Sequence, residues 1–511
     1  MNLLKSAASV SVMTLLSRIT GFVRDTLLAV TFGAGFAMDA FVVAFRIPNL
    51  LRRLFAEGAF SQAFVPVLGE YRARKGEEAT KALVDRVTGA LGVALLVATA
   101  VGVVAAPLVV YASAWGFTRD ADKFALTVQM LRICFPYIFF ISLTSLAGGI
   151  LNTWGSFKAP AFTPVLLNLS FIGFALLAAP YFDRPIVALA WAVFAGGILQ
   201  LAFQVPFLAR IRMLPRPRWD PKDEGVIRIL KLMAPAALGV SVAQVSLVIN
   251  TQIASLLGNG PVSWLYYADR LMEFPSGLLG VALGTVLLPS LVKHHQGGDG
   301  EAYSALLDWG LRLTVLLAAP AAIGLAMTAV PLVATLFWHG EFTRHDVLMT
   351  RSALVAYAAG LLGIILVKIL APGFYARQDI RTPVKVAIAT LVVTQVANAA
   401  LVPWLRHAGL AAAISVGACF NAAWLYWLMR RSGAYRPQPG WGAFLLKVSV
   451  ALYMMGGVIW YGMGSEMSWF AMTAGPRAAK LAALVAGSAL AYFGTLWLVG
   501  FRLRDFSRHE R

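Results

Sequence analysis

Residues 11–32 read SVMTLLSRITGFVRDTLLAVTF. A helix of this length crosses the roughly 30 Å hydrocarbon core of a bilayer. Its polar residues and one glycine recur at steps of three and four, which places them along one stripe of the helix. They are Ser11, Thr14, Arg18, Gly21 and Asp25. A polar stripe on an apolar helix indicates a membrane span with one side facing protein or water.

The whole chain has the composition of a membrane protein. Of its 511 residues 59% are hydrophobic and only 13% are charged, with a mean hydropathy of +0.74. Soluble domains carry about 25% charged residues, so the composition excludes a soluble globular protein. We expect an all-α polytopic membrane protein with fourteen transmembrane helices. The expected spans are 8–32, 37–69, 82–111, 124–151, 159–179, 185–208, 226–257, 262–292, 303–329, 346–375, 384–403, 408–429, 441–463 and 478–501.

The net charge of +19 follows from basic loops. With fourteen spans, 22 Lys and Arg residues fall in loops on one side and 6 on the other. The smaller set is Arg119, Lys123, Arg184, Arg344, Arg406 and Arg477. Because basic loops stay on the cytoplasmic side, we expect both termini in the cytoplasm. This interpretation explains the charge without a nucleic-acid partner.

The two halves of the chain match at a nearly constant shift. Pro66 aligns with Pro289, a shift of 223, and the same shift aligns residues 151–160 (LNTWGSFKAP) with 374–383 (FYARQDIRTP). The match predicts two six-helix lobes related by a parallel repeat, with two extra C-terminal helices. The expected domains are 1–222 (N-lobe), 223–440 (C-lobe) and 441–511. Two lobes around a central cavity form a transporter architecture.

The second predicted span combines charges with hinge residues. Acidic and basic residues share one helix face at steps of seven and four, while Arg52 points to the side. They are Asp39, Arg46, Arg53 and Glu57. Pro48 removes a backbone hydrogen bond. Gly58 and Ser61 have small side chains, which make the next helix turn narrow, and Gly21 is a comparable small residue in the first span. We expect packing or hinge roles for Gly21, Pro48 and Gly58, and a supporting role in the cavity for Ser61.

The eighth predicted span repeats the combination of charges and small residues. It carries Asp269, Arg270 and Glu273, followed by Gly277 and Gly280 on a face that allows close helix packing. An arginine at the centre of a span costs about 2.5–3.5 kcal/mol on insertion scales. Such charges therefore need partners or a water-filled cavity.

The charges within these spans can be interpreted in two ways. Six arginines face five acidic residues in the first, second and eighth spans, which suits a structural ion-pair network as well as a cationic substrate site. The excess of Arg over Lys favours the second, because a guanidinium binds phosphate bidentately and stays charged when desolvated. We expect a phosphate-bearing anion in a central cationic cavity. No ATP-binding loop of the form GxxxxGK[ST] occurs, and the six His residues show no metal-ligand spacing, so we expect no metal site.

Four segments of this chain carry a family resemblance. They are SRITGFVRDTLLAVTFGAG (17–35), MDAFVVAFRIPNLLRRLFAEGAFSQAFVPV (38–67), YYADRLMEFPSGLLGVALGTVLLPSL (266–291) and GFYARQDIRTPV (373–384). The chain resembles the MurJ (MviN) family of lipid II flippases, within the multidrug/oligosaccharidyl-lipid/polysaccharide (MOP) exporter superfamily. The resemblance covers nearly the whole chain and implies a non-enzymatic transporter of the bacterial inner membrane. Its implied substrate is the undecaprenyl-diphosphate-linked peptidoglycan precursor.

The resemblance also assigns residues. The family's cavity arginines map onto Arg18, Arg24, Arg52 and Arg270, which would hold the diphosphate. Further motif positions match Asp25, Asp39, Arg53, Glu57 and Ser61. The two extra C-terminal helices would form the groove for the lipid tail. Some members are thought to use sodium near the seventh and eleventh spans. This chain offers Asn250, Thr394 and Asn398 there, without a mid-span carboxylate, which leaves sodium coupling open.

The mechanism that we expect is alternating access driven by the membrane potential. Outward movement of an anion runs downhill when the inside is negative, and the same field returns the empty cationic site. Expected partners are lipid II, the phospholipid bilayer and cell-wall synthesis enzymes. The alternatives are a flippase for another polyprenyl-diphosphate-linked glycan, a cation or drug antiporter, and a scaffold for cell-wall enzymes.

Overall fold

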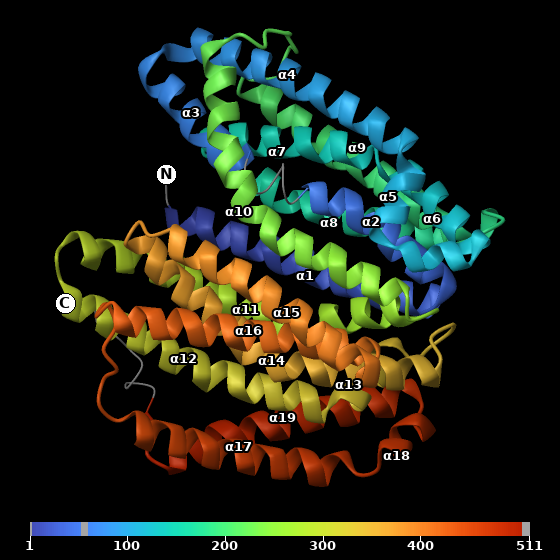
Figure 1. Cartoon of the computed structure of the whole chain (residues 1–511), viewed down its shortest axis with the longest axis vertical. Coiled ribbons are helices and arrows are strands. Elements are labelled where there is room, and N and C mark those ends of the chain that lie inside the picture. Colours follow the sequence, from blue (N-terminus) through green and yellow to red (C-terminus); the bar gives the residue numbers. More distant parts are fainter. Residues whose placement is uncertain (1–2, 53–59, 503–511) are drawn as a thin grey trace. The chain divides into compact units, whose positions relative to one another are not determined.

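A computed structural model describes the chain except residues 1–2, 53–59 and 503–511. The side chains of 3–11, 62, 234–243, 278 and 280–286 also lie outside the described part. Every regular element among the described residues is helical (Figure 1). The expectation of an all-α fold is confirmed.

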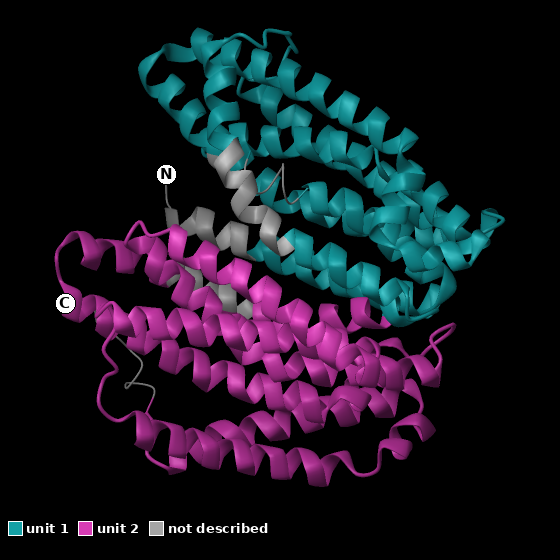
Figure 2. Ribbon diagram, viewed as in Figure 1, with its two compact units in different colours: residues 1–263 teal, residues 264–511 magenta. Residues whose placement is uncertain are grey.

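The chain divides into two compact units, residues 1–263 and 264–511 (Figure 2). The complete helices of unit 1 are α1 (Leu3–Phe32), α2 (Phe36–Arg52), α3 (Phe60–Arg74), α4 (Gly76–Val104), α5 (Ala106–Ser113), η2 (Trp115–Arg119), α6 (Ala121–Cys134), α7 (Tyr137–Thr153), α8 (Lys158–Gly173), η3 (Phe174–Ala178), η4 (Ala179–Tyr181), α9 (Val187–Arg210) and α10 (Glu224–Ser255). Helix α1 packs on α8, α8 and α7 pack on α9, and α2 packs on α6. These contacts bring α1 and α8 together at the site described below.

The core of unit 1 lies among α3, α4, α7 and the neighbouring helices. Phe64 of α3, Val84 of α4 and Ile150 of α7 are fully buried in it. Helix α10 joins the same core through Val226 and Ile229. The first unit thus includes α10, which lies beyond the 1–222 boundary expected for the N-lobe.

Unit 2 contains the remaining helices. Helix α11 (Pro261–Gln296) begins at the end of unit 1 and continues into unit 2. The others are α12 (Gly300–Met327), α13 (Ala329–Phe337), α14 (Arg344–Ala376), α15 (Arg381–Leu405), α16 (His407–Arg431), α17 (Trp441–Met463), α18 (Glu466–Ala471) and α19 (Ala474–Leu498). Helix α14 packs on both α12 and α16, while α17 packs on α12 and α19. The second core is therefore formed around α14, and a third lies between α12, α17 and α19.

The chain is a multi-pass membrane protein. Ten helical segments in the described part are long and apolar enough to cross a membrane. The expected spans at 8–32, 37–69, 226–257 and 262–292 are not among them; each includes residues or side chains outside the described part. The count of fourteen, the internal repeat and the three expected domains stay predictions.

Two of the turns between helices contain a glycine with a left-handed backbone conformation. Helix α1 ends at Phe32 and α2 begins at Phe36, with Gly33 at φ 66° in the left-handed region that suits glycine. The turn before α11 is formed in the same way, with Gly260 at φ 108°. These two turns place the start of α2 and the start of α11 at the ends of short, sharply folded connections.

Candidate functional site

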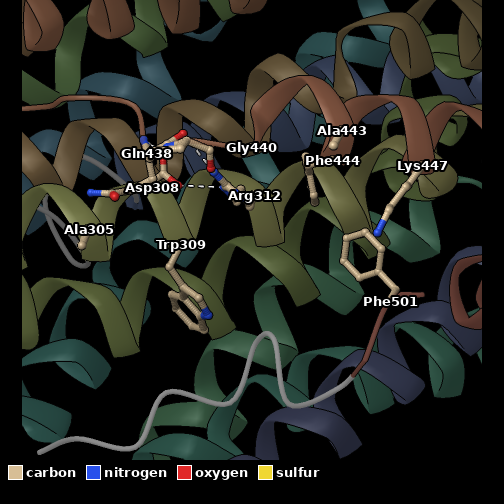
Figure 3. A pocket seen from close by; sticks show the side chains of 11 residues that line it. Ala305, Asp308, Trp309, Arg312, Gln438, Gly440, Ala443, Phe444, Lys447 and Phe501 are labelled. Atoms are coloured by element: carbon tan, nitrogen blue, oxygen red, sulfur yellow. Dashed lines mark hydrogen bonds and ion pairs between the residues drawn. The ribbon is translucent and has the colours of Figure 1, made fainter. Parts of the chain in front are cut away.

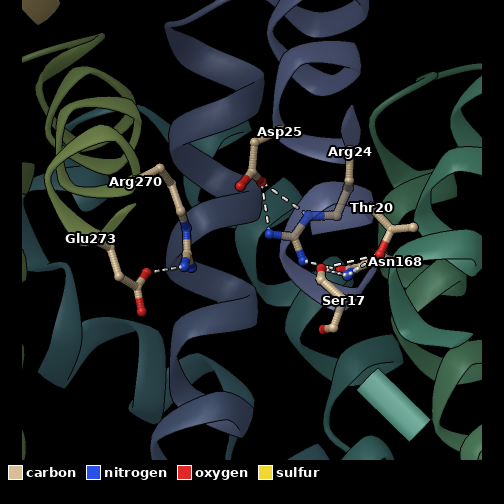
Figure 4. Close-up of polar contacts among 7 residues, drawn as sticks. All are labelled: Ser17, Thr20, Arg24, Asp25, Asn168, Arg270 and Glu273. Atoms are coloured by element: carbon tan, nitrogen blue, oxygen red, sulfur yellow. Dashed lines mark hydrogen bonds and ion pairs between the residues drawn. The ribbon is translucent and has the colours of Figure 1, made fainter. Parts of the chain in front are cut away.

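A polar cluster joins α1 to α8. Arg24 donates from Nε and Nη2 to Oδ1 of Asp25, at 3.0 and 2.8 Å, and from Nη1 to Oδ1 of Asn168 at 2.9 Å (Figure 4). Its guanidinium also lies 5.3 Å from the ring centroid of Phe171. Charge-assisted bonds of this kind are stronger than neutral ones. The cluster therefore fixes the direction of Arg24 within the helix pair.

Asn168 was missed by the sequence analysis. Its Nδ2 donates to the carbonyl oxygen of Ser17 at 3.0 Å and to Oγ1 of Thr20 at 3.1 Å, while its Oδ1 accepts from Arg24. A Cβ on Gly21 would lie 3.4 Å from the same Nδ2. Gly21 therefore faces Asn168 across the contact between α1 and α8, and its packing role stays a prediction. The available signal was an amide in the middle of the otherwise apolar segment 159–179.

Arg18 differs from Arg24 in its contacts with the protein. It lies on α1, is half-buried, and makes no hydrogen bond or ion pair within the described part of the chain. Asp25, on the same expected stripe, is buried and bound to Arg24. Of the two arginines on α1, one is fixed by protein partners and the other remains available to an anion.

Two arginines of α2 donate hydrogen bonds to uncharged side chains. Nη1 of Arg46 donates to Oγ1 of Thr251 on α10 at 2.5 Å, and Nε of Arg52 donates to Oδ1 of Asn49 at 2.9 Å. Helix α2 continues through the buried Pro48 to Arg52. Arg53, Glu57 and Gly58 lie outside the described residues; Ser61 is half-buried in α3. These bonds position Arg46 against α10 and Arg52 against its own helix.

Asp39 lies in a buried ion pair. It is fully buried and accepts from Nζ of Lys123 at 2.9 Å, the backbone nitrogens of Gly260 and Ser263 at 2.7 and 2.8 Å, and Oγ of Ser263 at 2.6 Å. Lys123 also donates to Oδ1 of Asn259 at 2.8 Å. We expected Lys123 in the loop just before the span 124–151, and it lies in the first turn of α6. It is 2% exposed near the start of α6, because Asp39 and the ring of Phe117, 4.2 Å from its Nζ, provide its surroundings.

The charges of α11 form a local pair. Nη1 of Arg270 donates to Oε2 of Glu273 at 2.6 Å, and the Arg270 guanidinium lies 5.0 Å from the ring centroid of Tyr266 (Figure 4). Asp269 is exposed and Gly277 is buried. The side-chain position of Gly280 lies outside the described part. Half of Glu273 is exposed, so solvent screens the pair and an arriving anion can compete for Arg270.

A lone lysine in α14 also contacts α11. Nζ of Lys368 donates to the carbonyl oxygen of Ser276 at 2.9 Å. This carbonyl immediately precedes Gly277. Lys368 is thus placed one helix turn from the Arg270–Glu273 pair within unit 2.

The comparisons with known proteins identify the family. Residues 28–478 match the family model described as Lipid II flippase MurJ. The lipid II flippase MurJ of Burkholderia cenocepacia is 54% identical over 518 residues, covering all of both chains. The chain belongs to the MurJ family. The probable lipid II flippase MurJ of Vibrio cholerae is 42% identical and covers 98% of this chain and 97% of its own.

Solved structures share the fold. A lipid II flippase MurJ in an inward closed conformation has a TM-score of 0.82 at 24% identity, covering 98% of this chain and 99% of its own. An inward-facing multidrug resistance MATE transporter of the MOP superfamily has a TM-score of 0.69 at 15% identity, covering 83% and 98%. The resemblance to the MurJ family is confirmed, and the fold is shared with a MATE transporter of the MOP superfamily. As a member of the MurJ family, the chain is a transporter rather than an enzyme.

Sodium coupling within this MurJ chain stays open. Asn250 is buried in α10 of unit 1, and Thr394 and Asn398 are buried four residues apart on α15 of unit 2. Nδ2 of Asn398 donates to Oε1 of Gln395 at 3.0 Å. In the described part of the chain, no group of three or more His, Cys, Asp and Glu residues could hold a metal ion.

Proposed function

We propose that this chain is a lipid II flippase of the bacterial inner membrane. It would move the undecaprenyl-diphosphate-linked peptidoglycan precursor from the inner to the outer leaflet, with both termini in the cytoplasm. Membership of the MurJ family supports the substrate, since the 54% identical relative carries that name over its full length. The proposal includes fourteen spans arranged as two six-helix lobes and two C-terminal helices.

The observation that carries the proposal is the unequal use of the two arginines on α1. Arg24 is held by Asp25 and Asn168, while Arg18 has no hydrogen-bond or ion-pair partner within the described residues. An unpaired guanidinium within a membrane helix is costly unless an anion or water meets it. We assign diphosphate binding to Arg18, Arg24, Arg52 and Arg270, because guanidinium groups match phosphate oxygens bidentately.

Alternating access provides the movement in this proposal. The expected lobes would rock about the loaded cavity, while the lipid tail stays in the groove of the last two helices. Each elementary charge that crosses the field contributes about 2.3 kcal/mol per 100 mV. Export of the anionic headgroup and inward return of the empty arginines would both use this field. The proposal assigns no metal or other cofactor and leaves sodium coupling open.

Charge reversal tests the arginine site. Arg24→Glu places a carboxylate beside Asp25, removes the donors to Asn168, and should abolish growth when the native protein is depleted. Arg184→Glu is the matched control. It makes the same charge change at an exposed arginine, whose Nη2 lies 3.9 Å from Oδ1 of Asp122. Immunoblots of membranes should show equal amounts of both variants. Full growth of cells with Arg24→Glu at normal membrane levels would refute the assigned role.

A further inference from the structure

Unit 2 contains a cavity of about 520 Å³ away from the arginines discussed above (Figure 3). Its walls come from α12, from the connection before α17, from the first turns of α17 and from Phe501 beyond α19. Trp309 and Phe444 provide aromatic lining, and Arg312 and Lys447 provide basic side chains. The cavity is thus both aromatic and basic, which are the properties of a site at the membrane–water interface.

One wall is built around Asp308. Its Oδ1 accepts from the hydroxyl of Tyr435 at 2.7 Å, the backbone nitrogen of Gln438 at 3.0 Å and Nε1 of Trp441 at 2.7 Å. Its Oδ2 accepts from Nε of Arg312 at 2.8 Å. The carboxylate is therefore satisfied by protein groups. This network ties the connection before α17 to α12 and keeps the cavity open.

Lys447 supplies the uncompensated charge. Asp308 and Arg312 neutralise each other, and Nη2 of Arg312 also donates to the carbonyl oxygens of Gln438 and Pro439. The Lys447 ammonium lies 5.6 Å from the ring centroid of Phe501 and makes no hydrogen bond or ion pair among the residues that the structure describes. The cavity thus has a net positive charge.

The surroundings of the cavity are apolar and exposed. Leu446 on α17 is 67% exposed, and Trp497 and Leu498 on α19 are 62% and 76% exposed. In a membrane-spanning protein such surfaces meet acyl chains. Arg430 and Arg431, in the last turn of α16 before the connection that lines the cavity, are among the 22 basic loop residues expected on the cytoplasmic side. Anionic lipids are concentrated in the cytoplasmic leaflet.

We propose that this cavity binds the headgroup of an anionic phospholipid, with its phosphate at Lys447 and its acyl chains along the exposed faces of α17 and α19. A basic pocket between membrane helices suits such a headgroup. The adjoining apolar faces favour a whole lipid over a free phosphate ion, because only a lipid covers them. The site would make this transporter responsive to the lipid composition of its membrane.

Lipid binding to the purified full-length protein tests the proposal. Native mass spectrometry would compare phosphatidylglycerol with phosphatidylcholine of the same acyl chains. We expect about five-fold tighter binding of phosphatidylglycerol, the factor that one basic residue contributes near a membrane surface. Lys447→Gln should abolish this preference. Lys385→Gln, which removes an exposed lysine from α15, should retain it.

A second variant tests the cavity without changing any charge. Ala443→Trp fills the space from an exposed position on α17 and should also abolish the preference. A preference that survives both variants would overturn the proposal. Displacement by millimolar inorganic phosphate would instead identify a free-anion site, and tighter binding of undecaprenyl phosphate would identify a substrate site; either result would also overturn it.

Discussion

Replacing Lys123 by Met tests the buried ion pair of unit 1. The substitution keeps the volume of the side chain but leaves Asp39 charged and fully buried. Breaking such a pair costs about 3–5 kcal/mol. Asp39 keeps three donors, from Gly260 and Ser263, so we expect the lower value of about 3 kcal/mol. With ~2 °C for each kcal/mol in a unit of this size, the melting temperature should fall by about 6 °C.

The assay is thermal unfolding of the purified protein in detergent, followed by intrinsic fluorescence. Lys231→Met is the matched control, because Lys231 is exposed on α10 and should melt within about 1 °C of the unchanged protein. The double variant Lys123→Met with Asp39→Asn removes both charges and should recover part of the loss. A Lys123→Met protein that melts with the control would refute this reasoning, as would strictly additive losses in the double variant.

Three further substitutions give distinct outcomes. Asn168→Leu removes an acceptor from Arg24 and should lower transport about ten-fold at unchanged protein level, measured by precursor access in cells. Gly360→Ala puts a Cβ 2.4 Å from a backbone Cα of α16, so it should cost about 1–3 kcal/mol in unfolding free energy, measured by melting. Burial raises the pKa of the Asp379 carboxyl, but hydrogen bonds from Thr382 and Arg381 together with the charge of Arg377 hold the pKa below its usual value. Asp379→Ala should therefore cost about 1 kcal/mol in unfolding free energy at pH 7. The melting difference should begin to shrink below about pH 4 and disappear once the pH falls below the lowered folded pKa.

Each of these three predictions has a control and a result that would contradict it. Asn152→Leu changes an exposed asparagine and should transport normally; equal transport by both Asn variants would contradict the role of Asn168. Gly324→Ala enters open space in α12 and should not destabilise, so equal melting of the two Gly variants would contradict the packing argument. For Asp379 the test is the direction in which the melting difference changes with pH. A carboxylate with a depressed folded pKa stabilises above its unfolded pKa and loses this stabilisation in acid, so a difference that grows in acid would contradict the assignment.

Helix positions were predictable because the bilayer fixes their length. The segment expected at 185–208 corresponds to α9 (Val187–Arg210), and that at 408–429 corresponds to α16 (His407–Arg431). Breaks inside the segments were harder. The expected span 124–151 consists of α6 and α7, separated at Phe135 and Pro136, whereas Pro206 and Pro372 lie inside continuous helices. A proline lacks one donor in every context, and the packing around it decides whether the helix ends.

The candidate site was predictable only along single helices. The stripe on α1 follows from spacing, and Asp25 was expected beside Arg24. Asn168 is 144 residues from Arg24, and Lys123 is 84 residues from Asp39. Periodicity within one helix carries no information about which helix packs against it. Partners across helices therefore required the structure.

Precursor access at the cell surface tests the central proposal most directly. The protein would be depleted, and an impermeant external probe would report lipid-linked peptidoglycan precursor in the outer leaflet. We predict that access collapses, that the unchanged protein restores it, and that Arg24→Ala does not. Unchanged access after depletion, with normal precursor synthesis and no other flippase in the cell, would contradict the assignment as a lipid II flippase.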